Sequence, residues 1–155
     1  MYRIVLILSF IGIICLNISA QANDPVKWTY TVKQISNTEA LLIFDAKIDP
    51  KWHLYSLYFP DGGPVRMSFN FTESKDYKKT GKVIENSKPK TERDDVFEID
   101  VQYFEGKASL SQKIEILSEK DFVIRGEFEY QACLEDKCVL YTPTFEFKIK
   151  GAKKT

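Results

Sequence analysis

Residues 122–131 read Phe-Val-Ile-Arg-Gly-Glu-Phe-Glu-Tyr-Gln, with large side chains recurring at even-numbered positions. These positions hold Phe122, Ile124, Phe128 and Tyr130. Successive side chains of a β-strand point to opposite faces, so this spacing predicts a strand with one face in a hydrophobic core.

The same alternation recurs along most of the chain. It predicts further strands at residues 26–32, 42–48, 52–55, 67–71, 108–116 and 145–149. Residues 72–95 are polar and rich in lysine, and we expect loops there with one short strand around Val83 and Ile84. No segment keeps a helical period over three turns. Many short strands separated by turns predict an all-β fold, an immunoglobulin-like antiparallel β-sandwich.

The first 22 residues have the layout of a secretory signal peptide. A basic residue precedes a short apolar run, and a small-x-small pattern ends the segment at Ala20 and Ala22, either of which is a possible cleavage site. An uncleaved membrane anchor is the alternative, but the apolar run is short for a span. We expect residues 1–22 to be removed together with Cys15, leaving residues 23–155 as a single domain.

Composition limits the functions open to this domain. The chain carries 22 basic and 22 acidic residues, so there is no basic excess that would attract nucleic acid. No second apolar run is long enough to cross a membrane. We expect a soluble monomer, periplasmic or secreted, that does not bind nucleic acid.

Two cysteines, Cys133 and Cys138, remain after the expected cleavage. An even number of cysteines in an oxidising compartment favours a pair that can form a disulfide. If the alternation of the flanking strands holds, both sulfurs lie off the core on one side of a hairpin end. A disulfide between Cys133 and Cys138 closes a short ring, so by reducing the entropy of the unfolded chain it stabilises the fold by only about 2 kcal/mol. These observations are compatible with two roles for the pair, thiol–disulfide exchange and a purely structural disulfide.

Two other functions are compatible with these residues. The chain is a secreted immunoglobulin-like binding module if its hairpin disulfide is purely structural. A metal site is a third possibility, because Cys133, Cys138 and the single histidine, His53, are soft ligands suited to copper or zinc. These three residues are far apart in sequence, so we expect neither a metal nor another cofactor.

The stretch at 130–138, Tyr-Gln-Ala-Cys-Leu-Glu-Asp-Lys-Cys, resembles the N-terminal periplasmic domain of the DsbD family of thiol:disulfide interchange proteins. Residues 94–110 resemble the cap-loop segment of that family and the strand after it. Residues 52–55 resemble the aromatic stretch that flanks its active site. The resemblance covers most of residues 24–150, and it implies an immunoglobulin-like sandwich, as the strand pattern does.

The resemblance implies a chemistry for the two cysteines. They would form a redox-active disulfide and be the catalytic residues of a thiol:disulfide oxidoreductase. In the family the second cysteine of the loop forms the mixed disulfide and the first resolves it, which assigns these roles to Cys138 and Cys133. The implied partners are thioredoxin-like periplasmic proteins. The membrane and thioredoxin-like portions of the family do not follow here, so a separate membrane electron donor is expected.

The resemblance also implies a cap over the disulfide. A phenylalanine of the family's cap loop shields the cysteine pair until a partner displaces it, and Phe97 matches that residue. Acidic cap residues match Asp95 and Asp94. Aromatic residues near the active site match Tyr55 and Trp52.

Overall fold

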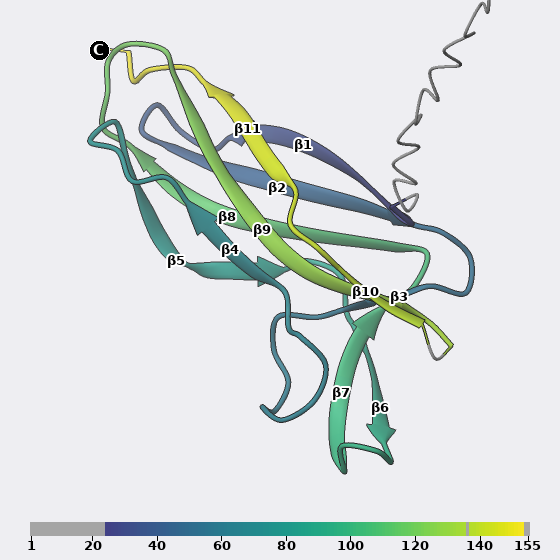
Figure 1. Cartoon of the computed structure of the whole chain (residues 1–155). Helices are drawn as coiled ribbons and strands as arrows, with labels where there is room; N and C mark the ends of the chain where they lie inside the picture. Colours follow the sequence, from purple (N-terminus) through teal and green to yellow (C-terminus); the bar gives the residue numbers. More distant parts are fainter. Residues whose placement is uncertain (1–23, 136, 154–155) are drawn as a thin grey trace, which may run out of the picture.

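A computed structural model describes residues 24–135 and 137–153, and within them every regular element is a β-strand (Figure 1). The strands form two antiparallel sheets, which confirms the predicted sandwich. The expected signal peptide, residues 1–22, lies outside the described residues together with Cys15. Across the described part of the chain, no helix has the length and apolarity needed to span a membrane.

The first sheet has the strand order β1-β2-β8-β5. Its strands are β1 (Val26–Gln34), β2 (Glu39–Ile48), β5 (Tyr77–Glu85) and β8 (Lys107–Ile116). The second sheet has the order β10-β9-β3-β7-β6, and β4 and β11 also pair with β9. Its strands are β3 (His53–Tyr55), β4 (Ser68–Phe71), β6 (Lys90–Asp94), β7 (Ile99–Phe104), β9 (Phe122–Leu134), β10 (Lys137–Tyr141) and β11 (Thr144–Ile149).

Aromatic side chains fill the main core between the sheets. Phe44, in the middle of β2, is fully buried. Its ring meets those of Phe145 and Phe147 edge to face, with ring centroids 5.1 Å apart in both pairs. Edge-to-face pairs of this kind add to the stabilisation that burial alone provides. The two sheets are therefore joined by interlocking rings contributed mainly by β2, β9 and β11.

The long strand β9 connects the two ends of the second sheet. Its first half pairs with β11 and β4, and its second half pairs with β10 and β3. Its buried even-numbered side chains belong to the main core, and these are Ile124, Phe128, Tyr130 and Ala132. Cys133 belongs instead to a separate cluster, as the period of two requires. One strand thus supplies both the centre of the core and the first cysteine.

The prediction for residues 72–95 is wrong, because two strands lie there instead of one short one. β5 runs from Tyr77 to Glu85 and β6 from Lys90 to Asp94. Both are edge strands of their sheets, and most of their side chains are exposed. An edge strand is held by backbone hydrogen bonds on one side, and lysine is a common residue there because it discourages pairing with other chains. Such strands need no apolar alternation.

Candidate active site

Cys133 and Cys138 lie opposite each other in the β9–β10 hairpin and form a disulfide, with their Cα atoms 4.1 Å apart. The pairing continues to Leu134 and Lys137, so only two positions lie between the strands. Glu135, the first of them, has a φ of 50°, in the left-handed region that two-residue hairpin turns use. The turn alone therefore brings the two sulfurs together.

The two cysteines differ in their accessibility. Cys133 is 3% exposed, whereas Cys138 is an exposed residue of an edge strand. The predicted position outside the main core is confirmed for both cysteines. Burial of Cys133 was not predicted, and it arises because a second cluster covers the outer face of the sheet at this end. Thiol–disulfide exchange depends on which sulfur a thiolate can reach, and of the two cysteines Cys138 is the residue exposed to solvent.

The second cluster lies on the face of the sheet opposite the main core. On β3 and β7 the neighbouring residues Leu54 and Phe104 point into the main core. The second cluster contains Cys133 with Tyr55, Phe59, Val101 and Tyr103, and Ile99 packs against its edge. The sulfur of Cys133 is therefore surrounded largely by aromatic and aliphatic groups.

The loop between β3 and β4 approaches this cluster closely. A Cβ atom at Gly63 would lie 2.6 Å from Cδ1 of Ile99, so the loop can rest on β7 because position 63 has no side chain. Further along the loop, the Val65 N–H donates a hydrogen bond to Oε1 of Gln131, at 2.6 Å. Nε2 of Gln131 donates to Sγ of Cys133, at 3.6 Å. The loop is thus connected to the buried sulfur through one amide side chain.

His53 pairs with Cys133 across β3 and β9, but its imidazole is turned toward β7. The ring stacks on Tyr103 with centroids 4.3 Å apart, and Nε2 lies 3.1 Å from Oε1 of Glu105. Lys90 also forms an ion pair with Glu105. The described residues contain no group of three or more histidine, cysteine or acidic side chains arranged to hold a metal. These contacts favour a structural role for the imidazole over a ligand role.

Acidic residues of β6 influence the hydroxyl groups of the cluster. Tyr103 donates a hydrogen bond to Oε2 of Glu92 at 2.7 Å. This bond, together with burial, raises the pKa of Tyr103 from 10.0 to about 12. Burial raises the pKa of Tyr55 too, with smaller contributions from the charges of Asp94 and Glu92. Both hydroxyls are therefore neutral at physiological pH.

The residues predicted to form the cap lie on the β6–β7 hairpin. Oδ1 of Asp94 accepts hydrogen bonds from the N–H groups of Val96 and Phe97, at 2.9 and 3.0 Å, and so shapes the turn. Phe97 is 46% exposed, and Asp95 is exposed. In Figure 1 the β6–β7 turn lies apart from the ends of β9 and β10. Shielding of the disulfide by Phe97 therefore stays a prediction.

The two predicted aromatic residues lie on opposite faces of the sheet. Tyr55 is a member of the cluster around Cys133, whereas Trp52 packs against the main core. Sequence reasoning missed Gln131, although its position two residues before Cys133 puts both side chains on one face of β9. It also missed Tyr103, because β7 was assigned only by its resemblance to a cap segment.

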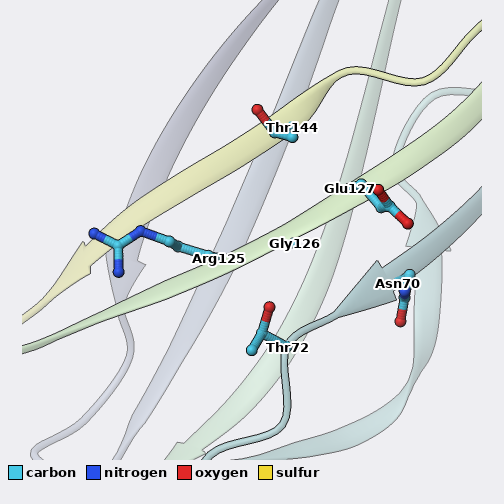
Figure 2. Close-up of a pocket in the computed structure, with 6 residues that line it drawn as sticks. All are labelled: Asn70, Thr72, Arg125, Gly126, Glu127 and Thr144. Carbon is cyan, nitrogen blue, oxygen red and sulfur yellow. The ribbon is translucent and has the colours of Figure 1, made fainter.

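A polar surface pocket lies elsewhere on the second sheet, around the first half of β9 (Figure 2). It is lined by Asn70, Thr72, Arg125, Gly126, Glu127 and Thr144. The guanidinium of Arg125 forms an ion pair with Glu146, with Nε and Oε2 3.0 Å apart. The pocket shares no residue with the cluster around the disulfide. The candidate active site is therefore the cysteine end of the sheet.

Comparison with known proteins identifies related sequences and folds. Residues 21–149 match the family described as thiol:disulfide interchange protein DsbD, N-terminal. The N-terminal periplasmic domain of ScsB from Proteus mirabilis has a similar fold, with a TM-score of 0.60 and 17% sequence identity. That match covers 81% of this chain and 47% of the ScsB chain, so this chain spans about half the length of its relative.

A second solved structure is the DsbD n-terminal domain of Neisseria meningitidis in the reduced form. Its TM-score is 0.47 and its sequence identity is 16%, and the match covers 81% of this chain and 86% of that one. No curated protein sequence is significantly similar to this chain.

Substituting Glu92→Gln should lower the pKa of Tyr103 from about 12 toward its ordinary value of 10.0, because the charged acceptor is lost. With the raised pKa, the folded state holds the phenolic proton more tightly than the unfolded chain. The contribution of Tyr103 to the free energy of unfolding is therefore fully present below about pH 10 and is lost as the pH rises toward about 12. This loss should be smaller in the variant. Tyrosine ¹³Cζ NMR titration and urea unfolding at alkaline pH measure both effects.

Glu115→Gln, at an exposed position on β8, is the matched control. Identical titration of Tyr103 in the two variants would show that the Glu92 contact does not set this pKa.

Proposed function

Because the chain belongs to the family of DsbD N-terminal domains, we propose that it is an exported module that relays electrons through the Cys133–Cys138 pair. The observation that supports this most directly is the asymmetry of the pair, in which Cys138 is an exposed residue and Cys133 is a buried one. A partner can attack Cys138 while Cys133 remains shielded from competing thiols. The ScsB relative is a periplasmic domain, in keeping with removal of residues 1–22 and function of residues 23–155 in that compartment.

In the first half of the cycle the domain is reduced and accepts two electrons. A thiolate of the donor attacks Sγ of Cys138, the bond between the two cysteines breaks, and its electron pair passes to Sγ of Cys133. The second thiolate of the donor then attacks the donor sulfur that is bonded to Cys138, and Cys138 is released as a thiolate. The donor is left as a disulfide, and the domain becomes a dithiol after taking up two protons.

In the second half the domain reduces a target disulfide. The Cys138 thiolate attacks one target sulfur and expels the other as a thiolate. Cys133 then attacks Cys138, restoring the internal disulfide and releasing the second target thiolate. We propose thioredoxin-like proteins as the partners, with a separate membrane protein as the electron donor.

A secreted binding module with a structural disulfide is the second candidate function. The packing of Cys133 among aromatic side chains favours this second function, because a cysteine buried in such a cluster is suited to a permanent structural disulfide. The two functions differ in whether the disulfide equilibrates with thiols while the domain stays folded.

The protein should equilibrate with glutathione or dithiothreitol buffers in the range of redox-active proteins, without unfolding. Quenching the thiols at each buffer ratio and counting them by mass spectrometry measures the equilibrium, and circular dichroism follows the fold. A Cys15→Ala background prevents any retained leader from contributing a thiol. A disulfide that is reduced only as the fold melts would favour the structural staple.

The two cysteines should behave differently in a trapping experiment. With Cys133→Ser, the mixed disulfide at Cys138 cannot be resolved internally, so complexes with a thioredoxin-like protein should accumulate. With Cys138→Ser, they should not form, because the remaining sulfur is buried. Non-reducing electrophoresis after mixing with thioredoxin-like proteins reads the result. Equal trapping by the two variants would show that the roles are assigned wrongly.

We also propose that Phe97 shields the disulfide in the free domain, with Asp94 and Asp95 forming the acidic part of this cap. The fixed turn around Phe97 and the electrostatic influence of Asp94 on Tyr55 support a cap on this hairpin. An aromatic ring near the exposed Cys138 would slow the approach of a small thiolate without preventing attack by a partner that displaces the ring.

Phe97→Ala should raise the rate at which glutathione reduces the disulfide and lower the unfolding free energy by only about 1 kcal/mol. Stopped-flow reduction and urea denaturation measure these two quantities. Phe44→Ala is the control for a core ring, and it should cost about 3–5 kcal/mol. An unchanged reduction rate in Phe97→Ala would place the cap elsewhere.

A further inference from the structure

We propose that Gln131 stabilises the thiolate that Cys133 becomes when the disulfide opens, and that the Val65 N–H orients its amide for this role. The inference rests on the proposed function and adds a positioned hydrogen-bond donor to it. Gln131 contacts a reacting sulfur directly, so it would be a catalytic residue.

The need for a donor follows from the burial of Cys133. When a partner attacks Cys138, the departing electron pair becomes a negative charge on Sγ of Cys133. Cys133 is 3% exposed as a residue and belongs to the cluster that contains Tyr55, Phe59 and Val101. Burial without a compensating polar contact disfavours a charged group and would slow the opening of the bond.

Among the described residues, the hydrogen bond to Sγ of Cys133 comes from Nε2 of Gln131, at 3.6 Å. The hydroxyl of Tyr103 is already committed to Glu92, and the imidazole of His53 is turned toward Glu105. A neutral disulfide sulfur is a weak acceptor, whereas a thiolate is a strong one. The same contact would therefore strengthen as negative charge develops on the sulfur.

The orientation of the amide is set by the loop between β3 and β4. A glutamine amide can present either its NH₂ group or its carbonyl oxygen to a neighbour. Oε1 of Gln131 accepts the Val65 N–H at 2.6 Å, which leaves the NH₂ group facing the sulfur. The reverse orientation would turn the carbonyl oxygen toward the thiolate and oppose its formation.

The loop in turn is held by its fit against β7. Gly63 leaves room for Ile99, and Val65 follows two residues later in the same loop. Ordered contacts therefore run from Ile99 through Gly63 and Val65 to Gln131 and the sulfur. The amide is oriented before a partner arrives, so no reorganisation is needed when the bond opens.

Charged groups near Cys133 also influence the pKa of its thiol, and a pH titration must distinguish their effect from that of Gln131. Glu92 and Asp94 on β6 influence Tyr55 in the cluster. His53 on β3 lies opposite Cys133, and Lys137 on β10 precedes Cys138. Each of these groups remains in place when only Gln131 is changed, so the change in the thiol pKa reports the amide.

The first test compares Gln131→Leu with Gln34→Leu, in the full chain with Cys15→Ala. Gln34 is an exposed glutamine at the end of β1 and serves as the matched control. In the Cys138→Ser background, ¹³Cβ NMR titration gives the thiol pKa of Cys133. We expect this pKa to rise in Gln131→Leu only, and the rate of reduction by dithiothreitol in the intact pair to fall about tenfold.

Gln131→Glu distinguishes two roles of Gln131, as a hydrogen-bond donor to the sulfur or only as the acceptor that holds the loop. A carboxylate can still accept the Val65 N–H, so the loop contact is retained, but it cannot donate to the sulfur and it repels a thiolate. We expect a larger rise in the thiol pKa and slower reduction than in Gln131→Leu. If Gln131→Glu behaves like the wild type, the amide is structural and the inference fails.

The failure of this inference is distinguishable from failure of the proposed function. A wild-type disulfide that resists thiols while folded would overturn the function, whereas the thiol pKa in the Cys138→Ser protein still tests the amide. A wild type that exchanges readily, with an unchanged thiol pKa and reduction rate in Gln131→Leu, would overturn the inference alone.

Discussion

The two faces of β9 impose the constraint on which the rest of the structure depends. Its even-numbered side chains must lie in the main core, where Phe128 and Tyr130 pack between the sheets. The period of two then forces Gln131 and Cys133 onto the other face. A shift of one residue would bury those polar and reactive groups between the sheets and expose the aromatic ones. The same packing that holds the sandwich together therefore places the reactive end.

A second layer on that outer face distinguishes the two sulfurs. β3 and β7 continue the sheet beside β9, and their alternate residues Tyr55 and Tyr103 form a small cluster over Cys133. Cys138 lies on the edge strand beyond this cluster and stays accessible. The exposure of Cys138 follows from strand order, because an edge strand has a neighbour on one side only, whereas the burial of Cys133 also involves Phe59 of the loop between β3 and β4. Thus sheet topology determines which cysteine is exposed to solvent.

Sequence reasoning recovered the parts of the fold that alternate strongly. The strands containing Phe44, Phe128 and Phe147 were predicted because each has one face in the main core. β6 was missed, and β5 was predicted only as a short strand around Val83 and Ile84. Edge strands are specified by backbone pairing, which leaves little pattern in side chains. The cluster around Cys133 was missed for another reason. It joins residues from three strands and a loop, and no local pattern shows which outer faces will be covered.

The small size of the disulfide ring links the proposed redox cycle to folding. Cys133 and Cys138 are five positions apart, so opening the bond releases little constraint on the unfolded chain. In a thermodynamic cycle, the stability that a disulfide adds equals the difference between its reduction free energies in the folded and unfolded states. About 2 kcal/mol corresponds to roughly 45 mV for a two-electron couple. Opening the bond therefore lowers the stability of the fold by only about 2 kcal/mol, and the aromatic main core that joins the sheets contains neither cysteine.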